Sequence, residues 1–125
     1  MIKNISKKTV LCSKCRICRS TLSKAIGLMF SGRINDYGLV FVFGNARRID
    51  MHMLFVFFPI DVIFLDDAMK VIELKERFLP FTFYYSHEKA RYVIELPAGT
   101  IRASKTLTGD IIELDKVTED QAKNR

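Results

Sequence analysis

Apolar residues form two kinds of pattern along this chain of 125 residues. The first is the nearly continuous apolar run, seen at residues 39–43 and 51–65, which is typical of strands buried on both faces. Pro59 and Asp61 interrupt the longer run, and proline cannot donate a hydrogen bond to a strand ladder. We therefore expect this run to hold two strands, at residues 51–57 and 61–65.

The second pattern is the alternation of apolar and polar side chains that predicts a half-buried strand. Residues 70–75 alternate in this way, and residues 91–96 place Glu95 on the opposite face from Ile94 and Leu96. Further short strands are expected at residues 9–12, 14–18 and 111–114.

Helical spacing and turn residues supply the remaining elements. Apolar residues recur at helical spacing after the capping residues Ser20 and Thr21, and Pro97 suits the first turn of a second short helix. The helices are expected at residues 21–30 and 97–104. The connections are expected to be a turn and loop at 44–48, a hairpin turn at 66–69, an aromatic loop at 76–90 and a turn at 108–110.

Six to eight short strands with two short helices predict a mainly β fold. Most connections are too short for a crossover helix, so we expect antiparallel strands in a compact sandwich or barrel. The length suits one domain. We place it at residues 7–114, after an N-terminal arm at 1–6 and before a polar C-terminal tail at 115–125.

Composition and targeting signals narrow the class of protein. With 49% hydrophobic residues, the chain is not intrinsically disordered. The run at 51–65 is too short for a membrane span and contains Asp61. Basic residues near the N-terminus are not followed by the apolar segment of a signal peptide. We expect a cytoplasmic protein with no membrane partner and no cofactor.

The net charge of +6 is concentrated in the first half of the chain, where residues 1–50 hold ten Lys or Arg against two Asp. Such a bias favours a weak nucleic-acid contact or a merely solvated cationic face. The interspersed basic side chains lack stacking aromatics, which favours the solvated face. The residues of the nucleic-acid hypothesis are Lys7, Lys8, Lys14, Arg16, Arg19 and Lys24.

Cys12, Cys15 and Cys18 form a C-x-x-C-x-x-C array. An odd number of cysteines argues against a closed disulfide framework, and an iron–sulfur cluster normally needs a fourth thiolate. In an extended segment, Cys12 and Cys18 share a face about 20 Å apart, at roughly 3.3 Å per residue, with Cys15 on the other face. We expect small buried side chains rather than a metal site.

Several motifs then follow in a specific order. Pro59-Ile60-Asp61 and Phe64-Leu65-Asp66 precede Ala90-Arg91-Tyr92 and Glu95-Leu96-Pro97-Ala98-Gly99, and Gly109-Asp110 stands near the end. This combination closely resembles the prokaryotic domain-of-unknown-function 192 family, over about residues 7–114. The resemblance implies a compact mainly β fold and no established activity.

The chain also departs from that family's pattern. Many members carry Phe-Trp-Met and Lys-Asn-Thr before the Pro-x-Asp motif, whereas this chain reads Met51-His52-Met53-Leu54-Phe55-Val56. His52 takes the tryptophan position and an apolar triplet replaces the polar one. A function that depends on the polar triplet is therefore not expected here.

Three residues are candidates for acid–base chemistry. A desolvated Asp61 would have a raised pKa, but the favoured interpretation is that it accepts backbone N–H bonds where proline breaks the ladder. Glu95 is expected to be solvated or bonded to a loop, and His52 to be a hydrogen-bonded core residue. If these side chains instead converge on one pocket, an enzyme of unassigned type is the alternative hypothesis.

The aromatic loop is the better functional candidate. Phe81, Phe83, Tyr84 and Tyr85 fall in a segment that is long and irregular, and loops often carry function. The leading hypothesis is a non-enzymatic domain that binds a small ligand or a partner protein, including a second copy, through an apolar groove near residues 78–87. Rings that merely cap the end of a barrel are the structural alternative. The binding residues proposed are His52, Asp61, Phe81, Phe83, Tyr84, Tyr85 and Glu95.

Overall fold

The fold is given by a computed structural model that describes residues 1–18, 37–52, 58–115 and 118–119. The helix expected at residues 21–30 and most of the strand expected at 51–57 lie outside these residues. The described part is mainly β, as predicted, with one short helix, α2 (Thr100–Ser104). No helix in it is long and apolar enough to cross a membrane.

A six-stranded sheet forms the centre of the molecule, in the order β11-β3-β4-β9-β6-β7. Its strands are β3 (Lys14–Cys18), β4 (Tyr37–Arg47), β6 (Ile60–Leu65), β7 (Val71–Phe78), β9 (Ala90–Pro97) and β11 (Thr118–Glu119). β9 lies between β4 and β6 and pairs antiparallel with both. Because it is paired on both edges and buried over much of its length, β9 is the central strand of the sheet.

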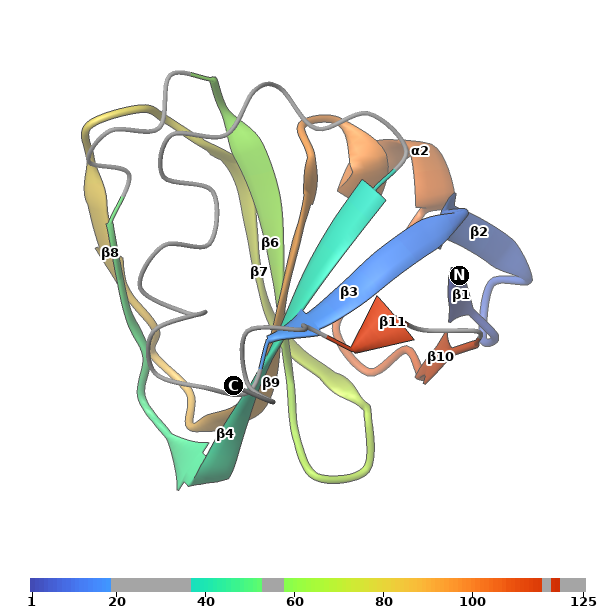
Figure 1. Cartoon of the computed structure of the whole chain (residues 1–125), viewed down its shortest axis with the longest axis horizontal. Coiled ribbons are helices and arrows are strands. Elements are labelled where there is room, and N and C mark those ends of the chain that lie inside the picture. Colours follow the sequence, from blue (N-terminus) through green and yellow to red (C-terminus); the bar gives the residue numbers. More distant parts are fainter. Residues whose placement is uncertain (19–36, 53–57, 116–117, 120–125) are drawn as a thin grey trace.

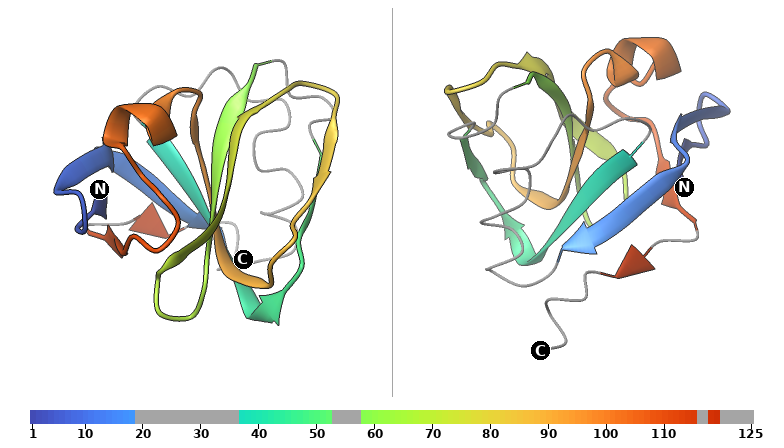
Figure 2. Two further views of the ribbon diagram at one scale, coloured as in Figure 1. Left: turned by 180° about the vertical axis from the view of Figure 1, so that it is seen from behind. Right: turned by 45° about the horizontal axis from the view of Figure 1, so that its top comes forward.

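Smaller elements cover the two faces of this sheet (Figure 1). A two-stranded ribbon, β5 (Asp50–His52) with β8 (Phe83–Tyr85), lies on one side. On the other side lie α2 and a three-stranded sheet of β1 (Ile2–Asn4), β2 (Thr9–Cys12) and β10 (Ile112–Leu114). Both views of Figure 2 keep the ribbon and α2 on opposite sides of the sheet.

Each face of the central sheet has its own hydrophobic core. The ribbon-side core includes Leu39, Phe41, Val62, Phe64 and Val93. The helix-side core is made of the alternate residues of the same strands together with the small elements, and includes Ile2, Cys12, Val40, Ile63, Ile94, Leu96 and Ile101. Alternation along β9 therefore assigns Val93 and Glu95 to the ribbon side, and Ile94 and Leu96 to the helix side.

The close packing of the helix-side core explains why residue 38 is a glycine. A Cβ atom at Gly38 of β4 would lie 2.8 Å from Ile2 Cδ1, 3.0 Å from Cys12 Sγ and 3.1 Å from Leu96 Cδ2. A larger residue fits there only if the surrounding side chains, Ile2 first, shift away. Gly38 thus lets the N-terminal strands pack directly on the central sheet.

Most strands lie where the sequence patterns place them. The strands at residues 9–12 and 14–18 have the expected bounds, and Asp61–Leu65 lie within β6. The hairpin turn at 66–69 is closed by a bond from the Asp66 amide to the Lys70 carbonyl at 3.0 Å. The polarity patterns were therefore sufficient for these short elements.

Two predicted connections and the start of one predicted helix were wrong in part. Residues 44–47 belong to β4, which continues past a register shift to pair Arg47 with Ala90. The expected loop at 76–90 contains the end of β7 and all of β8. Pro97 is the last residue of β9 rather than the first of a helix, and α2 begins only after Gly99, whose φ is 94°.

The expectation of antiparallel strands is wrong for two pairs. β3 pairs parallel with β4, and β11 pairs parallel with β3. Residues 19–36 separate β3 from β4, and a connection longer than a dozen residues permits a parallel crossover. The other described pairings are antiparallel.

Candidate functional site

Asp61 ties together three elements at one end of the helix side. Its Oδ1 accepts the Arg77 N–H at 3.0 Å, and its Oδ2 accepts the N–H groups of Gly99 and Ile101 at 3.1 and 2.9 Å. The side chain is fully buried. It supplies acceptors for the end of β7, where Arg77 has a φ of 48°, and for the start of α2. The interpretation of Asp61 as an acceptor of backbone N–H bonds is confirmed.

Glu95 lies on the opposite face of the sheet, in the middle of β9. Its neighbours in register are Leu39 of β4 and Val62 of β6. It is only 9% exposed and forms no hydrogen bond or ion pair within the described part of the chain. Burial among these apolar neighbours raises its pKa to about 8. The expectation that Glu95 is solvated or bonded to a loop is therefore wrong.

The two carboxylates do not form a common site. Asp61 is held on the helix side with Ile63 and Leu65, whereas Glu95 is on the ribbon side with Val93. The three hydrogen bonds that Asp61 accepts from described residues all come from backbone amides, so its carboxylate serves the fold in this arrangement. The geometry removes the motivation for an acid–base pair of Asp61 and Glu95.

Arg16 of β3 lies in the same transverse row of the sheet as Glu95. Arg16 pairs in register with Leu39, which in turn pairs with Glu95. Cys18, two residues further along β3, belongs to the ribbon-side core, so Arg16 faces the same side. Its Nε is buried and has no hydrogen-bond partner among the residues that the structure describes. Two groups of opposite formal charge thus flank Leu39 without contacting each other.

A polar network attaches the ribbon side of β7 to the segment that follows β8. The Tyr84 hydroxyl donates to Glu73 Oε2, and the amides of His87 and Glu88 each donate to Glu73 Oε1 at 2.8 Å. Burial raises the pKa of Tyr84 to about 12, together with its bond to Glu73. Burial also opposes ionisation of Glu73, but the bonds from Tyr84, Glu88 and His87 outweigh it and lower its pKa.

The ring of Tyr84 points inward from the ribbon. Its centroid lies 5.9 Å from that of Phe64 and 6.1 Å from that of Phe78, and Lys75 Nζ lies 5.2 Å from it. Tyr84 therefore anchors β8 to the central sheet. Of the predicted aromatic residues, it is the one with a clear structural role.

The residues on either side of Tyr84 face outward. Leu79, Phe81, Phe83 and Tyr85 are 49%, 54%, 71% and 55% exposed, and we call them the aromatic row. Phe83 pairs with His52 and Tyr85 with Asp50 across the ribbon. The structure describes the backbone of His52 but not its side chain. Phe83 and Tyr85 are thus brought together with the backbone of His52, and Asp61 and Glu95 are elsewhere.

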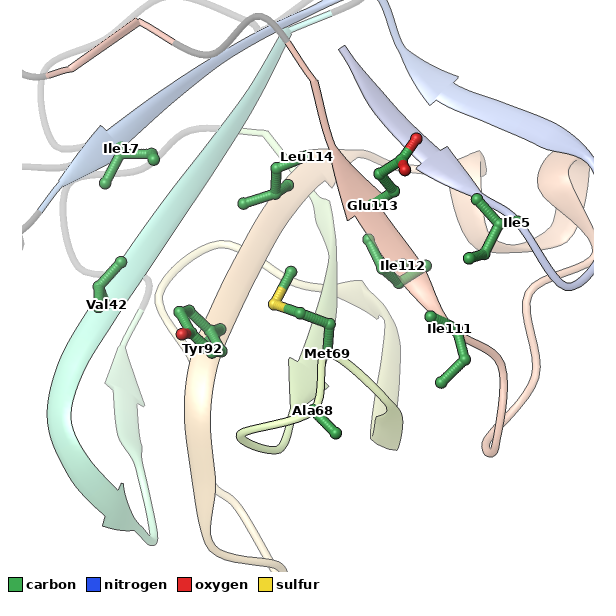
Figure 3. Close-up of a pocket in the computed structure, with 10 residues that line it drawn as sticks. All are labelled: Ile5, Ile17, Val42, Ala68, Met69, Tyr92, Ile111, Ile112, Glu113 and Leu114. Atoms are coloured by element: carbon green, nitrogen blue, oxygen red, sulfur yellow. The ribbon is translucent and has the colours of Figure 1, made fainter.

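A cavity of about 500 Å³ that no sequence pattern predicted lies on the helix side (Figure 3). Its described lining includes Val42, Met69, Tyr92 and Leu114, and Met69 projects into the space between Tyr92 and β10 (Figure 3). The polar side chains in this described lining are Tyr92, with its hydroxyl group, and Glu113, with its carboxylate. The lining comes from six separate stretches of sequence, so no local pattern could reveal it. The expected groove near residues 78–87 is not where this cavity lies.

The Gly109-Asp110 motif has a structural role at the N-terminus. Asp110 accepts bonds from Asn4 Nδ2 at 2.9 Å, Lys7 Nζ at 2.8 Å and the Leu107 amide at 2.9 Å. Burial opposes ionisation of Asp110, but the bonds from Asn4 and Lys7 outweigh it and lower its pKa. The motif therefore connects β1 and the segment after it to the segment before β10.

The three cysteines are buried in the two cores, and the structure describes some of the basic residues of the nucleic-acid hypothesis. Cys12 and Cys15 belong to the helix-side core and Cys18 to the ribbon-side core. No group of three or more His, Cys, Asp or Glu that could hold a metal ion exists within residues 1–18, 37–52, 58–115 and 118–119. Lys7 is paired with Asp110 and Arg16 faces the ribbon, while Arg19 and Lys24 lie outside the described residues.

Comparisons with known proteins agree with the fold. The model of family DUF192, described as "Uncharacterized ACR", matches residues 2–114. A UPF0127 protein of Thermococcus sibiricus is 35% identical over 98% of this chain and 79% of its own length. One of Pyrococcus horikoshii is 36% identical over 90% of this chain and 97% of its own length.

Two solved structures are also similar. A protein of Sinorhizobium meliloti described as a "putative transcription regulator" superposes with a TM-score of 0.75 and 27% identity, over 79% of each chain. A protein of unknown function from Novosphingobium aromaticivorans gives 0.75 and 21% identity, over 80% of this chain and 74% of its own. The second likeness concerns the fold alone.

Proposed function

Since the chain belongs to the DUF192 family, whose function is unknown, we propose that it is a non-enzymatic interaction domain whose partner is a second copy of the same chain. The observation that carries the proposal is the aromatic row. Its four apolar side chains alternate along the chain and are each about half exposed or more. Large apolar side chains that are left exposed can mark a protein interface.

The composition of the row favours a second copy as the partner. Residues 78–86 contain no charged side chain. A two-fold interface brings the same patch of surface against itself, so any charge within it would meet a like charge. An uncharged aromatic face avoids this repulsion. The row also extends onto the ribbon strand β8, which Tyr84 fixes from behind, so little conformational freedom is lost on association.

The oligomeric state in solution tests this proposal. Wild-type protein is expected to sediment as a dimer, and Phe83→Ser to shift it toward the monomer by at least tenfold in dissociation constant. Leu107→Ser is the matched control, since Leu107 is 58% exposed but lies outside the row. A wild-type protein that stays monomeric at all concentrations, or a dimer equally weakened by both changes, would contradict the proposal.

The helix-side cavity favours a second candidate function, the binding of a small apolar ligand. A volume of about 500 Å³ lies within the usual range for small-molecule sites. The fluorescent probe 1-anilinonaphthalene-8-sulfonate should bind wild-type protein, and Val42→Trp should remove that binding by filling the cavity. Phe83→Ser serves as the control. Binding that responds to Phe83→Ser but not to Val42→Trp would place the probe on the aromatic row and exclude this candidate.

The nucleic-acid hypothesis receives less support from the geometry. Lys7 already pairs with Asp110, and Arg16 is on the ribbon side of the sheet and only partly exposed. The Sinorhizobium meliloti protein is named as a regulator, but that name alone does not provide this chain with a phosphate-binding surface. Binding to duplex DNA that weakens steeply with salt would restore the hypothesis.

A further inference from the structure

Strand β10 forms one edge of the small three-stranded sheet, next to the helix-side cavity. The order of that sheet is β10-β1-β2, so β10 pairs with a strand of the sheet on one side only. A strand at the edge of a sheet presents backbone N–H and C=O groups that can pair with another extended chain. The hydrogen bonds of β10 decide whether such groups are left over here.

The hydrogen bonds along β10 show which residues face its outer edge. The Ile111 C=O and the Asp115 N–H both bond to residues that flank β1, at 3.0 and 2.8 Å. The backbone groups of successive residues in an antiparallel strand point to opposite sides, so Ile112 and Leu114 face away from β1. On that side the Ile112 N–H donates to the Met69 carbonyl at 2.9 Å. The N–H and C=O of Leu114 have no hydrogen-bond partner among the described residues.

The helix-side cavity lies along this edge of β10 rather than over one of its faces. Ile111, Ile112, Glu113 and Leu114 all line it, although consecutive side chains of a strand point to opposite faces. A cavity over one face would meet only every second residue. Leu114 points toward the same space as Met69 (Figure 3). The free backbone groups of Leu114 therefore border a largely apolar cavity of about 500 Å³.

A carboxylate beside the same edge adds a preference for charge. Glu113 is exposed and pairs in register with Lys3 of β1. The Lys3 ammonium, however, forms its ion pair with Asp115 Oδ2, at 3.4 Å. Glu113 itself has no ion pair within the part of the chain that the structure describes. A basic side chain on a strand added next to β10 would form a cross-strand pair of opposite charge with Glu113.

We propose that the edge of β10 binds an extended peptide segment of a partner protein, which becomes an additional strand of the three-stranded sheet. Pairing of this kind gains affinity from main-chain hydrogen bonds and specificity from pockets for alternate side chains. The partner residues next to Ile112 and Leu114 are apolar and point into the cavity. The residue between them is basic and lies beside Glu113. The segment thus has an apolar–basic–apolar pattern, as in Val-Lys-Val.

The proposal rests on access to the helix-side cavity, which the second candidate function also requires, and it does not depend on the aromatic row. Phe83→Ser should therefore leave peptide binding unchanged. If 1-anilinonaphthalene-8-sulfonate binds in the cavity and the peptide does not bind, this inference fails and the second candidate function stands. If neither binds, both fail.

Fluorescence anisotropy with labelled synthetic peptides tests the main-chain pairing on the full chain. The probe is Ser-Thr-Val-Lys-Val-Thr-Ser with blocked ends. The same peptide with both valines N-methylated keeps every side chain but lacks two main-chain donors, so it should bind at least tenfold more weakly. Because these changes are made in the peptide, the folding of the protein is not affected. Equal affinity for the two peptides would overturn the proposal.

An exchange of charges tests where the peptide lies. Glutamate in place of the central lysine of the peptide should weaken binding to the wild-type protein at least threefold at low salt, and Glu113→Lys should reverse this preference. Glu76→Lys is the matched control, since Glu76 is also exposed and the net charge changes equally, but it is on β7 and does not line the cavity. It should leave the preference as it is. A wild-type preference for the glutamate peptide, or the same result for both variants, would contradict the proposal.

Discussion

The two faces of the central sheet each bury one carboxylate, and the two carboxylates differ in their hydrogen bonding. On the helix side, Asp61 accepts three backbone N–H groups and joins β7 and α2 to β6. On the ribbon side, Glu95 sits in β9 between apolar neighbours and has no described partner. The first arrangement stabilises the fold, whereas the second lowers its stability whenever the carboxyl group is charged. One sheet therefore carries a carboxylate that holds the fold together and another that has no described partner.

Removing the Asp61 carboxylate should have the largest effect. Asp61→Ala leaves the buried Ile101 amide and the partly buried Arg77 and Gly99 amides without their acceptor, and we expect it to lower the free energy of unfolding by about 5 kcal/mol. Asp61→Asn should cost less because its amide oxygen still accepts one or two of these bonds. Urea denaturation followed by circular dichroism measures both changes. A loss below about 1 kcal/mol for Asp61→Ala would show that the comparison of the two faces is wrong.

Raising the pH should destabilise the protein through Glu95 by a slightly smaller amount. Its pKa is about 8 when folded and 4.5 when exposed, so the unfolded chain loses the proton first as the pH rises. The stability that the folded state gains by holding this proton is fully present below pH 4.5. It is lost between pH 4.5 and 8, by roughly 4–5 kcal/mol at 1.36 kcal/mol per pH unit. Denaturation at several pH values should show this fall in wild-type protein and not in Glu95→Gln. An identical pH dependence of stability in both proteins would contradict the raised pKa of Glu95.

Loss of the Tyr84 hydroxyl should have an intermediate effect. Tyr84→Phe keeps the ring between Phe64 and Phe78 but removes the donor to the Glu73 carboxylate. A hydrogen bond to a charged group contributes about 2 kcal/mol, and we expect a loss of that order in the free energy of unfolding. Hydrogen exchange at the amides of His87 and Glu88 should also become faster. Unchanged stability together with unchanged exchange would mean that the network does not hold the ribbon.

Changes in the aromatic row should have the smallest effect on stability. Phe83 is 71% exposed, so Phe83→Ser removes little buried surface, and the free energy of unfolding of the monomer should change by less than about 0.5 kcal/mol. Thermal denaturation at low protein concentration tests this. A loss of more than about 2 kcal/mol would mean that Phe83 belongs to the core, and the row would then be no interaction surface.

The contrast between Asp61 and Glu95 was only half predictable from sequence. Pro59 indicates that the strand ladder is broken beside Asp61. A carboxylate at such a break can accept hydrogen bonds from backbone N–H groups that the ladder leaves without partners. The alternation along residues 91–96 also gave the correct face for Glu95. It could not show that Glu95 is buried, because burial depends on tertiary packing that the pattern within residues 91–96 does not encode.

Other features depended on pairings that no local pattern encodes. The parallel pairing of β3 with β4 follows a long connection rather than a hairpin, and it alone places Arg16 in the row of Glu95. The aromatic segment was recognised, but the inward turn of Tyr84 among outward-facing neighbours required the partner Glu73 on β7. The cavity near Met69 likewise needed the positions of several strands at once.

The pKa of Glu95 tests the central claim most directly. The side-chain carboxyl carbon of Glu95 can be followed by nuclear magnetic resonance across pH 4–10, with Glu95→Gln used to assign its signal. The account predicts a midpoint near 8, since burial without a partner disfavours the charged form. A midpoint near the ordinary value of 4.5 would show that Glu95 is solvated or paired, and would contradict the difference between the two faces.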